Sequence, residues 1–232
     1  MLQVTMNAAG VGGVIQTAGS GVIQVPANGL ITVGAGDVPD LLKIGCTYVN
    51  SRNVVQTVAN ARAATAARIV TSTSLANGTL TVANQPDVPR QLAVQTIAGT
   101  VAISAGNVAV NYTANDGTTQ IDNFSMILGA SATATQNTSK GVVTVNSVIV
   151  TAMAGGASPG VQVNDTNALA IMVDNGFVNF SCLKETVAQS GLGVVNETAF
   201  TVASAAACVT PQTTPGTTNI YQFAASFVTP DS

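Results

Sequence analysis

A two-residue alternation of apolar and polar side chains, in short segments, constrains this chain more than any other feature. In the segment NVAVNYT, Val108, Val110 and Tyr112 fall on one side of an extended backbone. Asn111 and Thr113 fall on the other side. Because successive side chains of a β-strand point to opposite faces, this pattern is typical of a strand that is buried on one face. Similar segments recur between Gly, Asn and Pro residues, and such a series of short strands predicts an all-β fold of the β-sandwich type.

A turn signal follows directly after this segment. Asn115, Asp116 and Gly117 are residues that tolerate positive φ angles, and they precede a second extended run, TTQIDNFSM. Tight hairpin turns need such residues, because their central positions adopt backbone angles that most side chains disfavour. We therefore expect a β-hairpin with its tip at Asn115–Gly117.

The C-terminal part of the chain repeats the alternation. In NGFVNFSCL, Val178, Phe180 and Cys182 share one face. In the last segment, IYQFAASFV, one face carries Tyr221, Phe223, Ala225 and Phe227. The pattern predicts a β-sandwich domain over residues 57–232. The Ala-rich segment VANARAATAARIV has helical composition, but its position favours an extended entry into this sandwich.

The first part of the chain, residues 1–56, has a different character. It is rich in glycine and contains the best helix signal, DVPDLLKIG. Asp37 suits the N-cap, Asp40 suits the positive first turn, and Gly45 suits the C-terminal end of such a helix. A helix of about two turns is unstable alone, so it must dock on other elements. We expect an N-terminal arm or small module that carries one short helix.

The chain is poor in side chains that perform catalysis. Only 7% of its residues are charged, its net charge is −3, and it has no histidine. Catalytic arrangements and metal sites that need histidine are therefore excluded. Ser181 and Lys184 have Ser-x-x-Lys spacing, but they lie in a predicted strand, where this spacing does not bring them together. Asp165 and Asp174 lack the alternating oxygen ligands of a calcium loop between them. We expect no enzyme activity, no cofactor and no metal.

Charge and hydropathy patterns also bear on partners. The seven Lys and Arg residues are scattered, so no basic patch for nucleic acid is expected. No apolar run reaches the roughly 18 residues of a membrane helix, and the N-terminus lacks the features of a secretory signal. We expect a soluble chain made inside a cell, without a membrane partner. The three cysteines, Cys46, Cys182 and Cys208, are odd in number and widely spaced, which favours buried free thiols.

The segment QPDVPRQLAV places a scarce arginine beside two prolines. Pro86 and Pro89 lack amide donors, so they fit a turn or an edge that leads into the strand QLAVQTI. Asp87 and Arg90 then allow two interpretations. They pair locally within the turn, or Arg90 is presented to the backbone or carboxylate of a neighbouring subunit. The contact residues at issue are Asp87, Pro89 and Arg90.

Several segments resemble a recurring β-sandwich in virion proteins of tailed bacteriophages, including head decoration (cement) proteins. They are NQPDVPRQLAV, NYTANDGTTQIDNFSM, GVVTVNSVIV and VQVNDTNALAI, and the resemblance as a whole spans roughly residues 62–228. The leading segment LITVGAGDVPDLLKIGC is similar to short segments in phage structural proteins. The resemblance implies a protein on the outer surface of the capsid, commonly a homotrimer, that clamps neighbouring major capsid subunits.

Sparse surface charge agrees with this expectation. A monomeric domain usually has a surface that is roughly 25–35% charged, whereas a particle component is covered in part by its neighbours. The sequence thus predicts a non-enzymatic capsid decoration protein. A phage tail or collar component is an alternative, as is a receptor- or carbohydrate-binding adhesin domain. The adhesin is disfavoured because the chain has no Trp and three Tyr.

Overall fold

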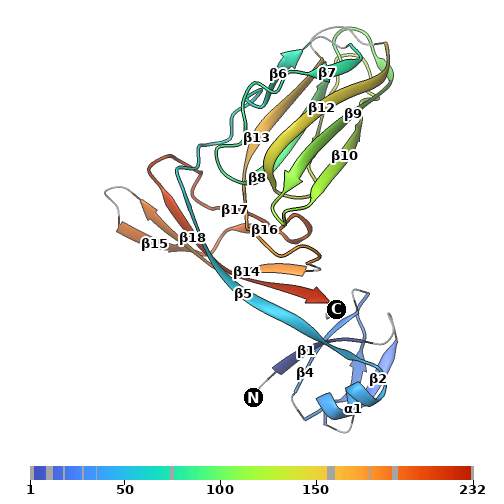
Figure 1. Cartoon of the computed structure of the whole chain (residues 1–232), viewed down its shortest axis with the longest axis vertical. Coiled ribbons are helices and arrows are strands. Elements are labelled where there is room, and N and C mark those ends of the chain that lie inside the picture. The colour runs from blue at the N-terminus through green and yellow to red at the C-terminus, as the bar shows by residue number, and fades with distance from the viewer. Residues whose placement is uncertain are drawn as a thin grey trace.

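The computed structural model is an antiparallel all-β protein with one short α-helix, which confirms the predicted fold class. It describes residues 3–8, 13–17, 19–27, 29–34, 36–73, 76–155, 160–177, 179–189 and 193–230. The strands around the three larger of its four apolar clusters follow one another along the long axis of the molecule (Figure 1). We call the parts around them the upper sandwich, the lower layer and the N-terminal module.

The upper sandwich consists of two antiparallel sheets that face each other across the largest core. One sheet has the order β10-β9-β12-β7 and the other β11-β8-β13-β6, and the two meet where Val142 of β12 pairs with Arg90 of β8. The strands are β6 (Val70–Thr73), β7 (Gly78–Leu80), β8 (Arg90–Ile97), β9 (Ile103–Ala114), β10 (Thr119–Ser125), β11 (Thr133–Asn137), β12 (Val142–Gly155) and β13 (Gly160–Ala170).

The lower layer is built on one sheet with the strand order β15-β14-β18-β5. Its strands are β5 (Thr47–Ala59), β14 (Asn179–Gln189), β15 (Gly193–Glu197) and β18 (Ile220–Pro230). The inner face of this sheet packs against the end of β13 and against a short excursion formed by β16 (Thr201–Ala203), the 3-10 helix η1 (Ser204–Ala206) and β17 (Cys208–Thr210). Because β17 also pairs with β13, the upper sandwich itself covers the lower core.

The N-terminal module contains β1 (Gln3–Asn7), β2 (Val14–Thr17), β3 (Gly21–Gln24), β4 (Leu30–Gly34) and α1 (Val38–Lys43). β1 pairs with both β4 and the start of β5, so the sheet of the lower layer continues into this module. The helix docks through Val38 and Leu41, as a helix this short requires. The boundary expected between residues 56 and 57 lies inside β5, and the division into two domains stays a prediction.

The C-terminal end of α1 agrees with the sequence prediction, whereas the role of its N-cap side chain differs from it. Gly45 follows α1 with φ at +89°, and Asp40 lies in the first turn. Asp37 is the N-cap residue, yet its side chain makes no capping hydrogen bond. Its carboxylate instead accepts the amide hydrogens of Gly19 (2.9 Å) and Ser20 (3.0 Å), so it fastens the β2–β3 turn to the helix. The capping role predicted for this side chain is therefore wrong.

The alternating segments form the strands that their patterns predict. The predicted inward faces of β9 and β18 are buried, and residues 61–65 contain no helix. The hairpin tip is formed with Gly117 at φ +79°, and Ala114 N–H donates to the Thr118 carbonyl (2.8 Å). Phe180 is buried and Cys182 half-buried, whereas Val178 lies outside the described residues. All three cysteines are free thiols.

Candidate functional site

Arg90, the arginine that the sequence marks out, lies fully buried at the start of β8. Its Nη2 is 2.7 Å from Oδ1 of Asp87, so the local pair suggested by the sequence is present. Its Nη1 donates to the carbonyl oxygens of Arg62 (3.1 Å) and Thr166 (3.0 Å). The carbonyl of Pro89 accepts a hydrogen bond from the last residue of β13 (2.8 Å). A guanidinium without exposed surface binds its own chain here and offers no group to a neighbouring subunit.

A second ion pair lies beside this one. Nη1 of Arg68 is 2.9 Å from Oδ2 of Asp165, whose side chain is fully buried. Burial raises the pKa of Asp165, and the positive charges of Arg90 and Arg68 oppose that rise. Burial lowers the pKa of Arg90, and Asp87 and Asp165 oppose that change. We call these four residues the Arg90 cluster, in which two cations compensate two anions, as buried charges require.

The Arg90 cluster holds the connection between the lower layer and the upper sandwich. This connection, residues 60–69, leaves β5 and crosses the end of the sandwich before β6 begins. The amide of Arg62 donates to Oδ2 of Asp87 (2.6 Å), and the amide of Ala64 donates to Oδ1 of Asn167 (2.7 Å). Side chains therefore replace the strand partners that this extended backbone lacks, and the cluster has a structural role.

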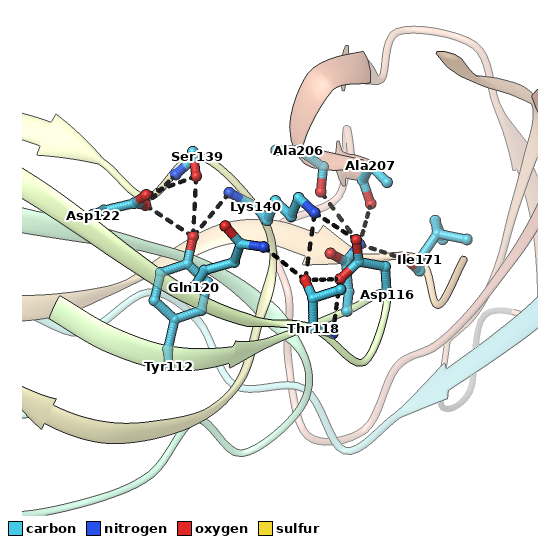
Figure 2. A network of polar contacts seen from close by, with 11 residues as sticks. Tyr112, Asp116, Thr118, Gln120, Asp122, Ser139, Lys140, Ile171, Ala206 and Ala207 are labelled. Carbon is cyan, nitrogen blue, oxygen red and sulfur yellow. Dashed lines mark hydrogen bonds and ion pairs between the residues drawn. The ribbon is translucent and has the colours of Figure 1, made fainter. Parts of the chain in front are cut away.

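A second polar network joins the two parts at the tip of the β9–β10 hairpin (Figure 2). Asn115 is fully buried there. Its side-chain amide donates to three backbone carbonyls, those of Ile171 (2.7 Å), Ala206 (3.2 Å) and Ala207 (3.4 Å). These carbonyls belong to the segment after β13 and to η1, which cover the lower core. Asn115, which the sequence predicts to form a turn, thus also connects the upper sandwich to the segment that covers the lower core.

Charged groups surround this tie without forming a reactive site. Lys140 Nζ lies 2.5 Å from Oδ2 of Asp116. Burial acts to raise the pKa of Asp116, but hydrogen bonds from Lys140 and Thr118 hold it below its usual value. The hydroxyl of Tyr112 donates to Asp122 (2.8 Å), and burial raises the pKa of this tyrosine. Each ionisable group has an internal partner, so the network stabilises the hairpin.

Two adjoining hollows lie on the outer face of the β14-β18-β5 sheet. One hollow of about 190 Å³ is lined by Thr57, Thr186, Ala188, Ile220 and Gln222. A second hollow of about 300 Å³ adjoins it and is lined by Val55, Lys184, Thr186, Gln222 and Ala224. We call this surface the open face. Apart from Lys184 its lining is neutral, and neutral surfaces of this kind suit contact with another protein.

Apart from Lys184, the residues of the open face were not singled out by the sequence, and neither were two buried glutamates. Glu185 and Glu197 are the only glutamates of the chain, and they face each other across β14 and β15. The composition does show that glutamate is rare in this chain, and this rarity was the one sequence signal for the pair. The exposed side of a half-buried strand, by contrast, follows from the alternation, but the alternation does not show whether another layer covers that side.

Two other arrangements considered from the sequence lead to no reaction centre. The Ser181 hydroxyl lies 2.8 Å from the Ser226 hydroxyl on the neighbouring strand, and Lys184 is exposed. Within the described residues, no group of three or more His, Cys, Asp or Glu side chains is placed to hold a metal ion. In the same part of the chain, no helix is long and apolar enough to cross a membrane.

Comparison with models of known protein families, with curated proteins and with solved structures gives no significant match. The resemblance to phage virion proteins therefore stays a prediction from the sequence.

Proposed function

We propose that this chain is a non-enzymatic structural protein of a tailed-bacteriophage virion, which decorates the outer surface of the head and bridges major capsid subunits. The proposal combines the sequence resemblance with one structural observation, the open face of the β14-β18-β5 sheet. We assign this face to the contact with the major capsid protein. The protein acts as a homotrimer in this proposal, and the surface between its copies is a different one.

The composition of the open face supports a permanent contact. Val55 is 66% exposed and Ile220 is 45% exposed, and threonine, alanine and glutamine residues lie between them. Flat sheet surfaces with apolar and uncharged side chains gain free energy when a partner removes them from water. One lysine, Lys184, offers a single point for charge complementarity.

The internal use of charge supports the same proposal. Arg68, Arg90 and Lys140 pair with aspartates of the same chain. Few ions are left to bind a charged substrate or to steer one toward the surface. A contact made by neutral groups also depends little on ionic strength, because screening acts on charges.

The arrangement of aromatic residues favours decoration over an adhesin. Every phenylalanine or tyrosine whose side-chain burial the structure describes is buried or half-buried, as Tyr112, Tyr221 and Phe223 illustrate. Carbohydrate and receptor sites commonly present aromatic rings at the surface, where the rings supply large contact areas.

Binding to heads that lack this protein tests the proposal. We expect the wild-type chain to sediment with such heads at low and at high salt. Ile220→Glu places a charge in the contact and should weaken binding by about tenfold or more, because the carboxylate loses its water without a partner. Ile121→Glu is the matched control, since Ile121 is 58% exposed on β10 of the upper sandwich.

Two results would count against the proposal. If the wild-type chain fails to bind heads, or if both variants bind as the wild type does, the open face is not the capsid contact. If Ile220→Glu splits an oligomer of the free protein, the open face joins copies of this chain, and its assignment to the capsid is wrong.

A further inference from the structure

The two glutamates of the chain occupy directly opposite positions in the β14–β15 hairpin. Glu185 of β14 pairs in register with Glu197 of β15. Neither side chain has substantial contact with water, since Glu185 is 0% exposed and Glu197 is 7% exposed. Facing residues of antiparallel strands have Cβ atoms about 5 Å apart, so two like charges at such positions repel each other. A chain with so few carboxylates has placed two of them where they conflict when both are ionised.

The surroundings of the pair stabilise one negative charge. Glu197 accepts a hydrogen bond from the Thr213 amide (2.9 Å) and another from the Thr213 hydroxyl. Both carboxylate oxygens of Glu185 are buried, and no donor among the described residues reaches them. Glu197 is close enough to form a hydrogen bond with Glu185 once one of the two carries a proton. The asymmetry assigns the charge to Glu197 and the proton to Glu185.

Among the side chains that the structure describes, the other elements that pack here bring no positive charge. Phe223 of β18 pairs with Glu185 from the opposite side. The nearby titratable groups are the Tyr221 hydroxyl and the Cys182 thiol, and for both, burial raises the pKa and Glu185 raises it further. Lys184 follows on the same strand, but its side chain is exposed on the open face. Because no cation neutralises the second charge, a shared proton is the remaining way to relieve the repulsion.

We propose that Glu185 and Glu197 share one proton and thereby form a pH-sensitive latch, which closes the β14–β15 hairpin at neutral and acidic pH and loosens it in alkali. β15 is the outermost strand of its sheet and is held by β14 alone among the described strands. Loss of the proton places two buried charges across that one contact. The hairpin therefore opens before the rest of the lower layer, whose inner strands pair on both sides.

The direction of the titration agrees with this geometry. Burial, followed by the neighbouring Glu197 carboxylate, raises the pKa of Glu185 well above its ordinary range, to about 8. The folded chain then holds a proton that the unfolded chain has released. The stability that this proton gives to the folded state is complete below the pKa of Glu185 in the unfolded chain. It falls as the pH rises from that pKa to the pKa in the folded chain, and it is lost above the latter.

Carbon-13 labelling of glutamate tests the latch in the wild-type protein. A chain with two glutamates gives two side-chain carboxyl signals in an NMR spectrum. We expect one of the two signals, that of Glu185, to titrate near pH 8. Two signals that both titrate near pH 4 to 5 would overturn the proposal. So would a calcium-dependent rise in melting temperature at pH 9, because the pair would then hold a cation in place of the proton.

A variant supplies the second measurement. Glu185→Gln keeps a donor toward Glu197 and cannot lose it to alkali. Between about pH 5 and pH 7.5 we expect the ratio of folded to unfolded wild-type protein to fall relative to this variant by up to about tenfold per pH unit, as release of one proton requires. Amide hydrogen exchange in β15 should accelerate above pH 8 in the wild type beyond its acceleration in the variant. Parallel stability curves for the two proteins would refute the latch.

Discussion

The upper sandwich and the lower layer bury the apolar faces of their sheets in different ways. In the upper sandwich two sheets bury their inner faces against each other, and residues of six strands form one core. In the lower layer one sheet buries its inner face against the end of β13 and against β17, while its outer face is open. The upper sandwich supplies both halves of its own core, whereas the core of the lower layer is covered by elements that pair with the upper sandwich.

The two parts therefore differ in whether a face of their sheets is left uncovered. A closed sandwich needs no further partner, because its apolar faces are already removed from water. A sheet with one open face keeps surface in contact with water, and we propose that another protein covers it. The residues between the two parts are polar, and ion pairs or hydrogen bonds within the chain hold them, as the Arg90 cluster and Asn115 show. A change at this junction should therefore affect the whole chain, whereas a change on the open face should affect only binding.

The largest expected effect is at the Arg90 cluster. Arg90→Ala leaves Asp87 and Asp165 without the cation that lies between the two parts. Removal of one partner from a buried ion pair costs about 3–5 kcal/mol, because the remaining charge stays desolvated. We expect this loss in the free energy of unfolding, measured with urea on the isolated protein.

Lys43→Ala is the control for loss of a positive charge. Lys43 pairs with Asp40 at 3.4 Å, but its side chain is 75% exposed. Exposed pairs contribute about 0–1 kcal/mol, so this variant should unfold almost as the wild type does. Equal stability of Arg90→Ala and Lys43→Ala would show that Arg90 does not join the two parts.

A smaller effect is expected at Asn115. Asn115→Ala removes a donor from three buried carbonyl groups of the segment that covers the lower core. The carbonyls of Ala206 and Ala207 keep backbone donors, so the carbonyl of Ile171 is the one that loses its donor. A buried acceptor left without a donor costs about 1–3 kcal/mol, and relaxation of the segment recovers part of that cost. We expect a loss of roughly 2 kcal/mol, with faster amide exchange in β17 than in β9. Uniform acceleration in both strands would contradict a tie located between the two cores.

The smallest effect is expected on the open face. Val55 and Val58 lie on the same strand, β5, but Val55 is 66% exposed and Val58 is 5% exposed. Val55→Thr should change the free energy of unfolding by less than about 0.5 kcal/mol. Val58→Thr places a hydroxyl in the lower core and should cost about 1–3 kcal/mol. Thermal unfolding of both variants compares the two faces, and equal losses would show that the outer face is covered within the chain.

The sequence was sufficient for the features that depend on neighbours along the chain. The alternation in β9 and β18, the hairpin at Gly117 and the end of α1 at Gly45 follow from local rules. The role of Asp37 does not, because its partner Ser20 comes from a distant turn. Glu185 meets Glu197 through strand register, which the sequence does not specify. Burial of Arg90 depends on Thr166 and Arg62, which the fold brings to it from separate segments.

A density map of a phage particle that contains this chain is the most direct test of the proposed capsid contact. We expect the chain on the outer surface of the head, with Val55, Ile220 and Gln222 of the open face against major capsid subunits. We also expect the upper sandwich to project away from that contact. A chain located in the tail, or one whose open face points to solvent on the head, would contradict the account.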